Sequence, residues 1–282
     1  MKLAGVFIFC GMISFSLSGC AALSASINRQ AYADKTASEH GFKREIIPTP
    51  FFQLTTFSKI NESGSPPHVY IEGDGYAWVS RAQLSDDPTP FQPVALYLAA
   101  KDSAENIVYL ARPCQYTPFN LDPECRSEYW TDSRFSEKVV SSMNEAINHI
   151  KLASGAKEIH LVGYSGGAAI AVLLAARRDD IASLRTIAGN LDPEAVNRHH
   201  GVTPLKNSLN PMDVASQLSD LPQRHFVGGQ DKTVPVFAAE NFVRKLGDYH
   251  CAEIILVNEV DHTTGWTERW AELLETATKQ CL

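Results

Sequence analysis

The sequence predicts an α/β fold, with a mainly parallel central sheet covered by helices on both faces. From residue 66 onward, short apolar runs rich in β-branched residues alternate with longer segments of helical apolar periodicity. Strands that alternate with helices form right-handed crossovers, which pack helices on both faces of a parallel sheet. With 282 residues the chain is long enough to bury the core of such a domain.

Charge and composition describe a globular chain with a mildly acidic surface. Charged residues make up 20% of the chain, the formal net charge is −7, and no repeat or low-complexity tract is present. Removing residues 1–19 takes away one lysine and no acidic residue, so −7 becomes −8. Because there is no basic cluster or arginine-rich helix, the sequence argues against nucleic-acid binding.

The first 19 residues predict an export signal. Lys2 precedes an apolar run over residues 3–17. This run is shorter than a membrane-spanning helix needs, and small residues interrupt it. The end of this run, Leu-Ser-Gly-Cys at 17–20, resembles a bacterial lipobox, which implies lipidation at Cys20 and anchoring in the cell envelope. Ala21 favours the outer membrane, facing the periplasm. The alternative is a plain cleavable signal with an incidental cysteine.

The expected organisation is therefore a lipoprotein signal peptide at 1–19, a tether at 20–45 and a folded domain at 46–282. The tether is polar and mixed in composition, and it includes a short helix around residues 32–39. Within the domain we expect strands at 51–57, 68–71, 107–110, 158–162, 184–188, 224–227 and 253–257.

Helices are expected between these strands. The clearest ones are at 135–153, with an apolar residue at every third or fourth position, and in the last segment, where Trp266, Trp270, Leu273 and Ala277 share a face. Residues 190–215, rich in Asn, Pro and His, are expected to be irregular. The remaining helices are predicted at 93–100, 168–178 and 236–246.

In an exported chain the cysteines are available for disulfides. Cys10 leaves with the signal peptide and Cys20 carries lipid, so four cysteines remain, with three pairings. Short loop closures favour Cys114–Cys125 and Cys251–Cys281, each stabilising by roughly 3 kcal/mol. Zinc is the rival use of cysteine, but the chain has no C-x-x-C or H-E-x-x-H spacing, so no metal site is predicted.

Gly163-Tyr164-Ser165-Gly166-Gly167 stands between a predicted strand and a predicted helix. A serine in this context is typical of a nucleophile elbow, and the glycines suit a strained turn with close chain approaches. The alternative is a serine that only caps a helix.

A serine hydroxyl is a weak nucleophile and needs a base held by a carboxylate. In a parallel sheet such groups lie after the carboxyl ends of later strands. Asp231 follows the strand at 224–227 and His262 follows the strand at 253–257, so the order is Ser, Asp, His. Asp192 competes with Asp231 as the acid.

The other histidines and the neighbouring acid are expected to be structural. His160 lies in a strand and reads as a core residue, His199-His200 as surface residues, and Asp261 as pointing away from the site.

Gly-Tyr-Ser-Gly-Gly at 163–167, Gly-Gly-Gln-Asp-Lys-Thr-Val-Pro at 228–235 and Asp261-His262 together resemble the α/β-hydrolase superfamily, over about residues 66–282. The likeness is greatest to exported bacterial hydrolases with Tyr-Ile-Glu-Gly-Asp-Gly and Arg-Pro-Cys-Gln-Tyr segments, here at 70–75 and 112–116. The resemblance implies the α/β-hydrolase fold, with Ser165 as nucleophile, Asp231 as acid and His262 as base, and no cofactor.

The resemblance also implies an oxyanion hole formed by the backbone N–H groups of Gly166 and Asp74. Where the family often has His-Gly-x, this chain has Glu-Gly-Asp at 72–74. A carboxylate aimed at an oxyanion would oppose the chemistry, so we expect the Asp74 side chain to turn toward Arg81 or Arg112. A dinucleotide-binding G-x-G-x-x-G starting at Gly73 fails, because position 78 is Trp.

The expected function is hydrolysis of a small-molecule or lipid carboxylic ester through an acyl-enzyme. Alternatives are lipase, thioesterase, peptidase or acyltransferase chemistry on the same fold, or a non-catalytic envelope binding module. Substrate choice resides in variable loops, so acyl length, leaving group and oligomeric state do not follow from the sequence. The loop between Cys114 and Cys125, Tyr129-Trp130 and residues 190–215 either shape the substrate pocket or form a stapled surface with an aromatic anchor.

Overall fold

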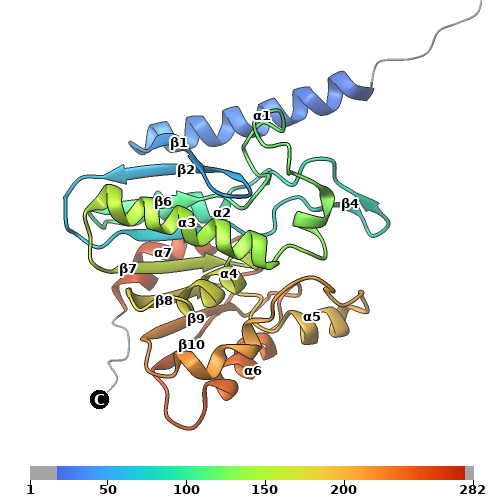
Figure 1. Cartoon of the computed structure of the whole chain (residues 1–282). Helices are drawn as coiled ribbons and strands as arrows, with labels where there is room; N and C mark the ends of the chain where they lie inside the picture. The colour runs from blue at the N-terminus through green and yellow to red at the C-terminus, as the bar shows by residue number, and fades with distance from the viewer. Residues whose placement is uncertain (1–17, 277–282) are drawn as a thin grey trace, which may run out of the picture.

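The computed structural model describes residues 18–276, and side chains from residue 28 onward. Its centre is an eight-stranded sheet in the order β1-β2-β6-β3-β7-β8-β9-β10 (Figure 1). Only the β1–β2 and β2–β6 pairs are antiparallel, which confirms the predicted mainly parallel sheet. The strands are β1 (Lys43–Pro48), β2 (Gln53–Ile60), β3 (His68–Ile71), β6 (Asn106–Leu110), β7 (Ile159–Tyr164), β8 (Ile181–Ile187), β9 (Gln223–Gly228) and β10 (Ala252–Val257).

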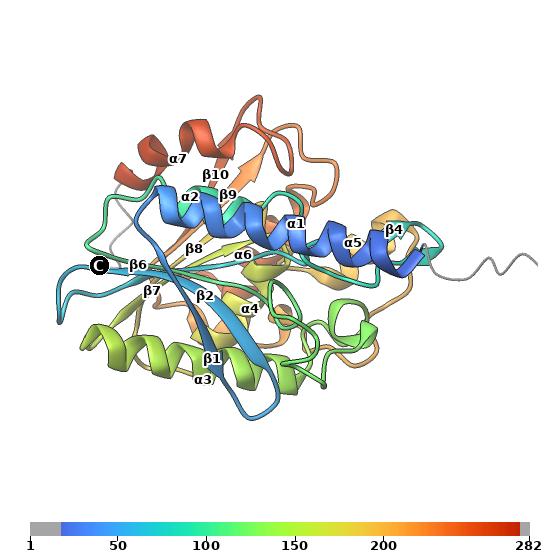
Figure 2. The same cartoon turned by 90° about the horizontal axis from the view of Figure 1, so that it is seen from above.

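Helices cover both faces of this sheet, as the alternating pattern predicts (Figure 2). On one face, α1 (Ser18–Glu39), α2 (Val94–Ala99) and α7 (Trp266–Glu275) pack over one apolar cluster. On the other, α3 (Glu137–Ser154), α4 (Gly166–Ala175) and α6 (Phe237–Leu246) pack over a second. Trp266 and Trp270 of α7 are fully buried, so the predicted apolar face of the last helix is the packed one.

The N-terminal segment differs from the expected tether with a short helix. Instead, α1 spans 22 residues and packs on the domain through Ala33 and Ala37, whose small, buried side chains let the helix approach closely. Arg29 also forms a buried ion pair with Asp87, 3.2 Å apart. Strand β1 begins at Lys43, so the packed elements start before residue 46.

Two further elements were not expected from the sequence. A small hairpin is formed by β4 (Trp78–Ser80) and β5 (Gln83–Leu84) between β3 and α2. Helix α5 (Pro193–His200) lies in the stretch expected to be irregular; Asp192 caps it and Pro193 occupies its first turn. An N-terminal Asp cap and a Pro in the first turn are both typical of a helix start, but this helix has only eight residues, which is too short to show a clear apolar period. No helix among residues 18–276 is long and apolar enough to cross a bilayer.

Candidate active site

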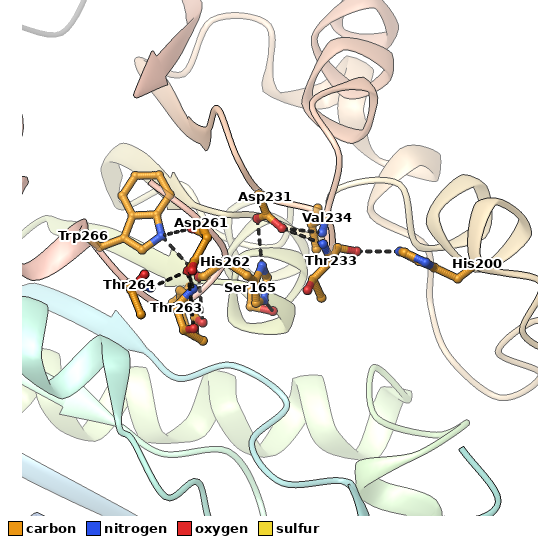
Figure 3. A network of polar contacts seen from close by, with 11 residues as sticks. Ser165, His200, Asp231, Thr233, Val234, Asp261, His262, Thr263, Thr264 and Trp266 are labelled. Carbon is orange, nitrogen blue, oxygen red and sulfur yellow. Dashed lines mark hydrogen bonds and ion pairs between the residues drawn. The ribbon is translucent and has the colours of Figure 1, made fainter. Parts of the chain in front are cut away.

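Ser165 occupies a sharp turn between β7 and α4, at the carboxyl edge of the sheet (Figure 3). Its backbone has φ 50° and ψ −119°, a strained conformation for a residue with a side chain. The turn is held by the Ser165 N–H, which donates to the Ile187 carbonyl of the neighbouring strand at 2.9 Å.

Two glycines of the motif are required because other backbone atoms occupy the space of a side chain. A Cβ on Gly163 would lie 2.5 Å from Cα of Ala168. A Cβ on Gly167 would lie 2.3 Å from the Ile71 carbonyl oxygen on β3. These approaches let α4 begin directly above the sheet, with the Ser165 side chain at its N-terminal end.

The structure brings the three predicted catalytic side chains into hydrogen-bonding contact (Figure 3). His262 Nε2 lies 3.0 Å from Ser165 Oγ, and His262 Nδ1 lies 2.8 Å from Asp231 Oδ2. The Asp231 carboxylate has no exposed surface, and the His262 side chain is 16% exposed. The histidine can therefore meet a substrate while its carboxylate partner is shielded from water.

Asp231 is held in place by its own loop. Its second oxygen, Oδ1, accepts hydrogen bonds from the backbone N–H groups of Thr233 and Val234, each at 2.8 Å. One carboxylate oxygen thus fixes the loop after β9, and the other faces the imidazole.

His262 is also supported from its backbone side. Its carbonyl accepts hydrogen bonds from the Tyr164 hydroxyl at 3.0 Å and from the Trp266 indole N–H at 3.2 Å. Neither support is predictable from the sequence alone. Tyr164 is the variable position of the Gly-x-Ser-x-Gly motif, and only the folded structure shows that it reaches the loop after β10.

Asp192, the alternative acid, and Asp261, expected to be structural, both have other contacts. Asp192 accepts a hydrogen bond from the Ala195 N–H at 3.0 Å and another from the Asn241 side chain at 2.8 Å. Asp261 accepts hydrogen bonds from the Thr263 and Thr264 N–H groups, and the Thr264 contact contributes most to lowering the pKa of Asp261. The Asp192 carboxylate therefore caps α5 and contacts α6, while the Asp261 carboxylate stabilises its own turn.

The other histidines take no part in the contact between Ser165 and His262. His160 hydrogen bonds to Ser183 at 2.7 Å, and burial lowers its pKa to about 4. His200 Nε2 donates to the Thr233 carbonyl at 2.8 Å, so it links α5 to the Asp231 loop.

The two expected oxyanion-hole residues lie next to one another. Gly166 is the first residue of α4, a position whose N–H has no acceptor within the helix. A Cβ on Gly166 would lie 2.0 Å from Oδ1 of Asp74, so the Asp74 carboxylate lies against this glycine. From this place beside the serine turn, the Asp74 side chain also reaches Arg112, as expected.

The charge of Asp74 is offset by two guanidinium groups. Arg112 pairs with Oδ1 at 3.3 Å and Arg134 pairs with Oδ2 at 3.1 Å. Arg112 is one of the two expected partners, and Arg134 is a further one that only the folded structure shows. Burial lowers the pKa of Arg112 to about 10, so this side chain stays protonated near neutral pH.

Glu72 immediately precedes Gly73 and Asp74 of the expected oxyanion loop, and its side chain is fully buried. Its Oε1 accepts the Gly73 N–H at 2.9 Å. Burial raises the pKa of Glu72 from 4.5 to about 7, partly offset by the hydrogen bond from the Gly73 N–H.

A disulfide joins Cys114 to Cys125, one of the two bridges that short loop closure favours. It closes the segment that supports the expected oxyanion loop, since Gln115 donates a hydrogen bond to the Gly73 carbonyl at 3.0 Å. The other bridge, Cys251–Cys281, involves a residue outside the described part of the chain. Among residues 18–276, no cluster of three or more His, Cys, Asp or Glu side chains is arranged to hold a metal ion.

No protein-family model and no curated protein matches the sequence. Solved structures do match. Est1E from Butyrivibrio proteoclasticus is 14% identical, with a TM-score of 0.58 over 82% of this chain and 97% of that one. The esterase Pf2001 of Pyrococcus furiosus is 14% identical, with a TM-score of 0.57 over 84% and 92%.

The acylaminoacyl peptidase of Pyrococcus horikoshii has a TM-score of 0.58 at 14% identity, over 85% of this chain and 42% of that one. At these identities the likeness is one of fold. Together with the strand order and the serine turn after β7, it shows that this chain has the α/β-hydrolase fold.

Proposed function

We propose that this protein is a serine hydrolase that cleaves carboxylic esters through an acyl-enzyme. The observation that carries the proposal is the continuous contact from Ser165 Oγ to His262 and on to the buried Asp231 carboxylate, with distances of 3.0 and 2.8 Å. A serine that only capped α4 would need neither partner, and its side chain makes no capping hydrogen bond.

In the first half of the reaction, His262 Nε2 removes the proton from Ser165 Oγ as this oxygen attacks the ester carbonyl. The N–H groups of Gly166 and Asp74 stabilise the oxyanion. The intermediate collapses with loss of the alcohol, which takes its proton from His262. In the second half, water attacks the acyl-enzyme with the same base, and the carboxylic acid leaves as Ser165 regains its proton.

The fixed Asp231 carboxylate orients the imidazole and stabilises its cation during both halves. The residues of this mechanism carry every proton transfer, so the proposal requires no cofactor. We also propose that the protein is exported and anchored by lipid at Cys20, as the lipobox-like segment suggests.

The test is covalent labelling of the folded, oxidised protein with a fluorophosphonate probe. We expect the wild type to be labelled, the Ser165→Ala variant to lose labelling, and Ser80→Ala, a change at an exposed serine of the β4–β5 hairpin, to keep it. If the folded wild type is not labelled, or if Ser165→Ala is labelled equally, the esterase proposal fails and a non-catalytic binding role takes its place.

Peptidase chemistry is the second candidate, because one similar structure is an acylaminoacyl peptidase. Turnover of matched ester, thioester and amide substrates with the same acyl group distinguishes the reactions. Preference for the amide would replace ester hydrolysis as the assigned chemistry.

A further inference from the structure

Four large apolar side chains are exposed around the β4–β5 hairpin. They are Trp78, Val79, Leu84 and Phe91, with exposed fractions of 46, 47, 39 and 54%. We call these four residues the apolar rim. Gathering such side chains on a short hairpin exposes apolar surface that a water-soluble protein ordinarily buries, and such patches mark interaction sites.

The apolar rim is carried by a segment that starts beside the serine turn and is held at its base. The hairpin is an insertion in the loop that begins at Asp74, which lies against Gly166. At its base, the Tyr76 N–H donates to the Pro88 carbonyl at 2.8 Å. The indole of the buried Trp130 donates to the Ser85 carbonyl at 3.1 Å. The rim therefore moves with the catalytic edge of the sheet.

Helix α1 is fixed to the same region through Arg29. This side chain pairs with Asp87 at 3.2 Å, donates to the Thr89 carbonyl at 2.5 Å, and stacks its guanidinium over the Phe91 ring at 4.5 Å. The N-terminal end of α1 lies on the side of the molecule that carries the hairpin, in both views (Figures 1 and 2).

The expected lipid-bearing residue therefore lies near the apolar rim. Cys20 is the third residue of α1 and nine residues before Arg29, which is about 14 Å along a helix. An anchor at this position would bring a bilayer to the end of the molecule that holds both the rim and Ser165.

We propose that the apolar rim inserts into the interface of a phospholipid membrane and presents Ser165 to esters held in that membrane. The proposal rests on the ester chemistry proposed above and names its substrate class. Trp78 suits the interface because its ring is amphipathic. The exposed charges of the hairpin region, Arg81 and Asp86, are opposite in sign, which fits a zwitterionic surface.

Tryptophan fluorescence tests the docking directly. The chain has four tryptophans, and Trp78 is the exposed one; Trp130 is 6% exposed, while Trp266 and Trp270 are fully buried. The full-length protein is mixed with or reconstituted into phosphatidylcholine vesicles with or without brominated acyl chains. We expect bromolipid quenching and protection from aqueous iodide in the wild type, and neither in Trp78→Phe.

A turnover experiment tests the substrate class. Val79→Ser combined with Leu84→Ser should lower hydrolysis of a long-chain ester in vesicles by about tenfold, because two apolar contacts with lipid are lost. Hydrolysis of a soluble short-chain ester should not change. Leu152→Ser is the matched control, since Leu152 is 83% exposed but lies at the end of α3 that precedes β7, the opposite edge of the sheet.

The outcomes separate the two proposals. Failure of the wild type to cleave either ester rejects the proposed chemistry, while the fluorescence still decides the docking. The docking proposal is overturned if Trp78 remains accessible to iodide and is not quenched by bromolipid. The docking is also overturned if Trp78 is protected from iodide without vesicles and this protection increases with protein concentration. That result would assign the apolar rim to contact with a second copy of this chain.

Discussion

At the residue scale, each functional group of the site is held by a neighbour that performs no chemistry. Asp231 offers one oxygen to His262 because the Thr233 and Val234 N–H groups hold the other. His262 keeps its position because the Tyr164 hydroxyl binds its carbonyl. The support of Asp231 is local to its loop, whereas Tyr164 lies 98 residues before His262. Residue types and order therefore predict the three side chains but not the tyrosine that holds the histidine.

Exchange of Asp231 for asparagine should remove the negative charge while keeping an oxygen for the Thr233 and Val234 N–H groups. We expect Asp231→Asn to lower kcat for a soluble ester by about 10⁴-fold with little loss of stability, because the imidazole loses its orienting anion. Asp192→Asn is the matched control and should retain activity. An equal loss in the two variants would show that Asp231 acts through folding rather than through His262.

Glu72 predicts a pH dependence of stability. Its pKa rises from 4.5 to about 7 on burial, so the stability associated with its protonated form is complete below about pH 4.5 and is lost as the pH rises to about 7. Glu72→Gln keeps an acceptor for the Gly73 N–H and cannot ionise. We expect the free energy of unfolding of this variant to be about 3 kcal/mol higher than that of wild type near pH 8, and equal to it near pH 4.

Urea unfolding at both pH values measures this difference, and Glu62→Gln at an exposed side chain is the control. A gain of the same size at both pH values would mean that ionisation of Glu72 is not its cause.

At the scale of elements, the turn between β7 and α4 depends on close backbone contact. The sequence predicted this strand and this helix from apolar runs on either side of the serine motif. Both elements are buried on nearly all sides, so neither has a polar face. The β4–β5 hairpin was missed because its strands have three and two residues, too short to show a period. The Glu-Gly-Asp segment predicted a loop, but it contained no signal for the Arg134 contact.

The Gly167→Ala variant tests the close approach at this turn. Its Cβ would lie 2.3 Å from the Ile71 carbonyl and 2.5 Å from the Glu72 carbonyl, both parts of the backbone that cannot move away. We expect a loss of about 3 kcal/mol or more of unfolding free energy, or failure to fold. Gly229→Ala, where the nearest atom would lie at 3.3 Å, should cost about 1 kcal/mol or less. Similar denaturant midpoints for the two variants would contradict this account.

At the scale of the whole molecule, α1 and β1 connect the N-terminal segment to the domain. Ala33, Ala37 and Phe42 are buried, and Arg29 binds the loop before α2. A chain that starts at residue 46 should therefore be less stable than one that starts at residue 20, by about 3 kcal/mol or more, because it exposes apolar surface and leaves Asp87 without its cation.

Denaturant unfolding of the two truncated chains measures this difference. A matched third chain, started at residue 28, keeps every described contact of α1 and should resemble the longer one. Equal stability of all three chains would mean that residues 20–45 act as a free tether and do not stabilise the domain.

The sequence by itself determined the fold class and the order of the major strands and helices, and it predicted Ser165, Asp231 and His262 as the candidate catalytic residues, because apolar patterning and position after a strand are local properties. Only the tertiary structure decided that Asp74 lies against Gly166 between two arginines, that Tyr164 supports His262, and that α1 packs beside the apolar rim. These contacts join residues far apart in the chain, and their geometry depends on how the whole sheet twists and how its loops meet at one edge.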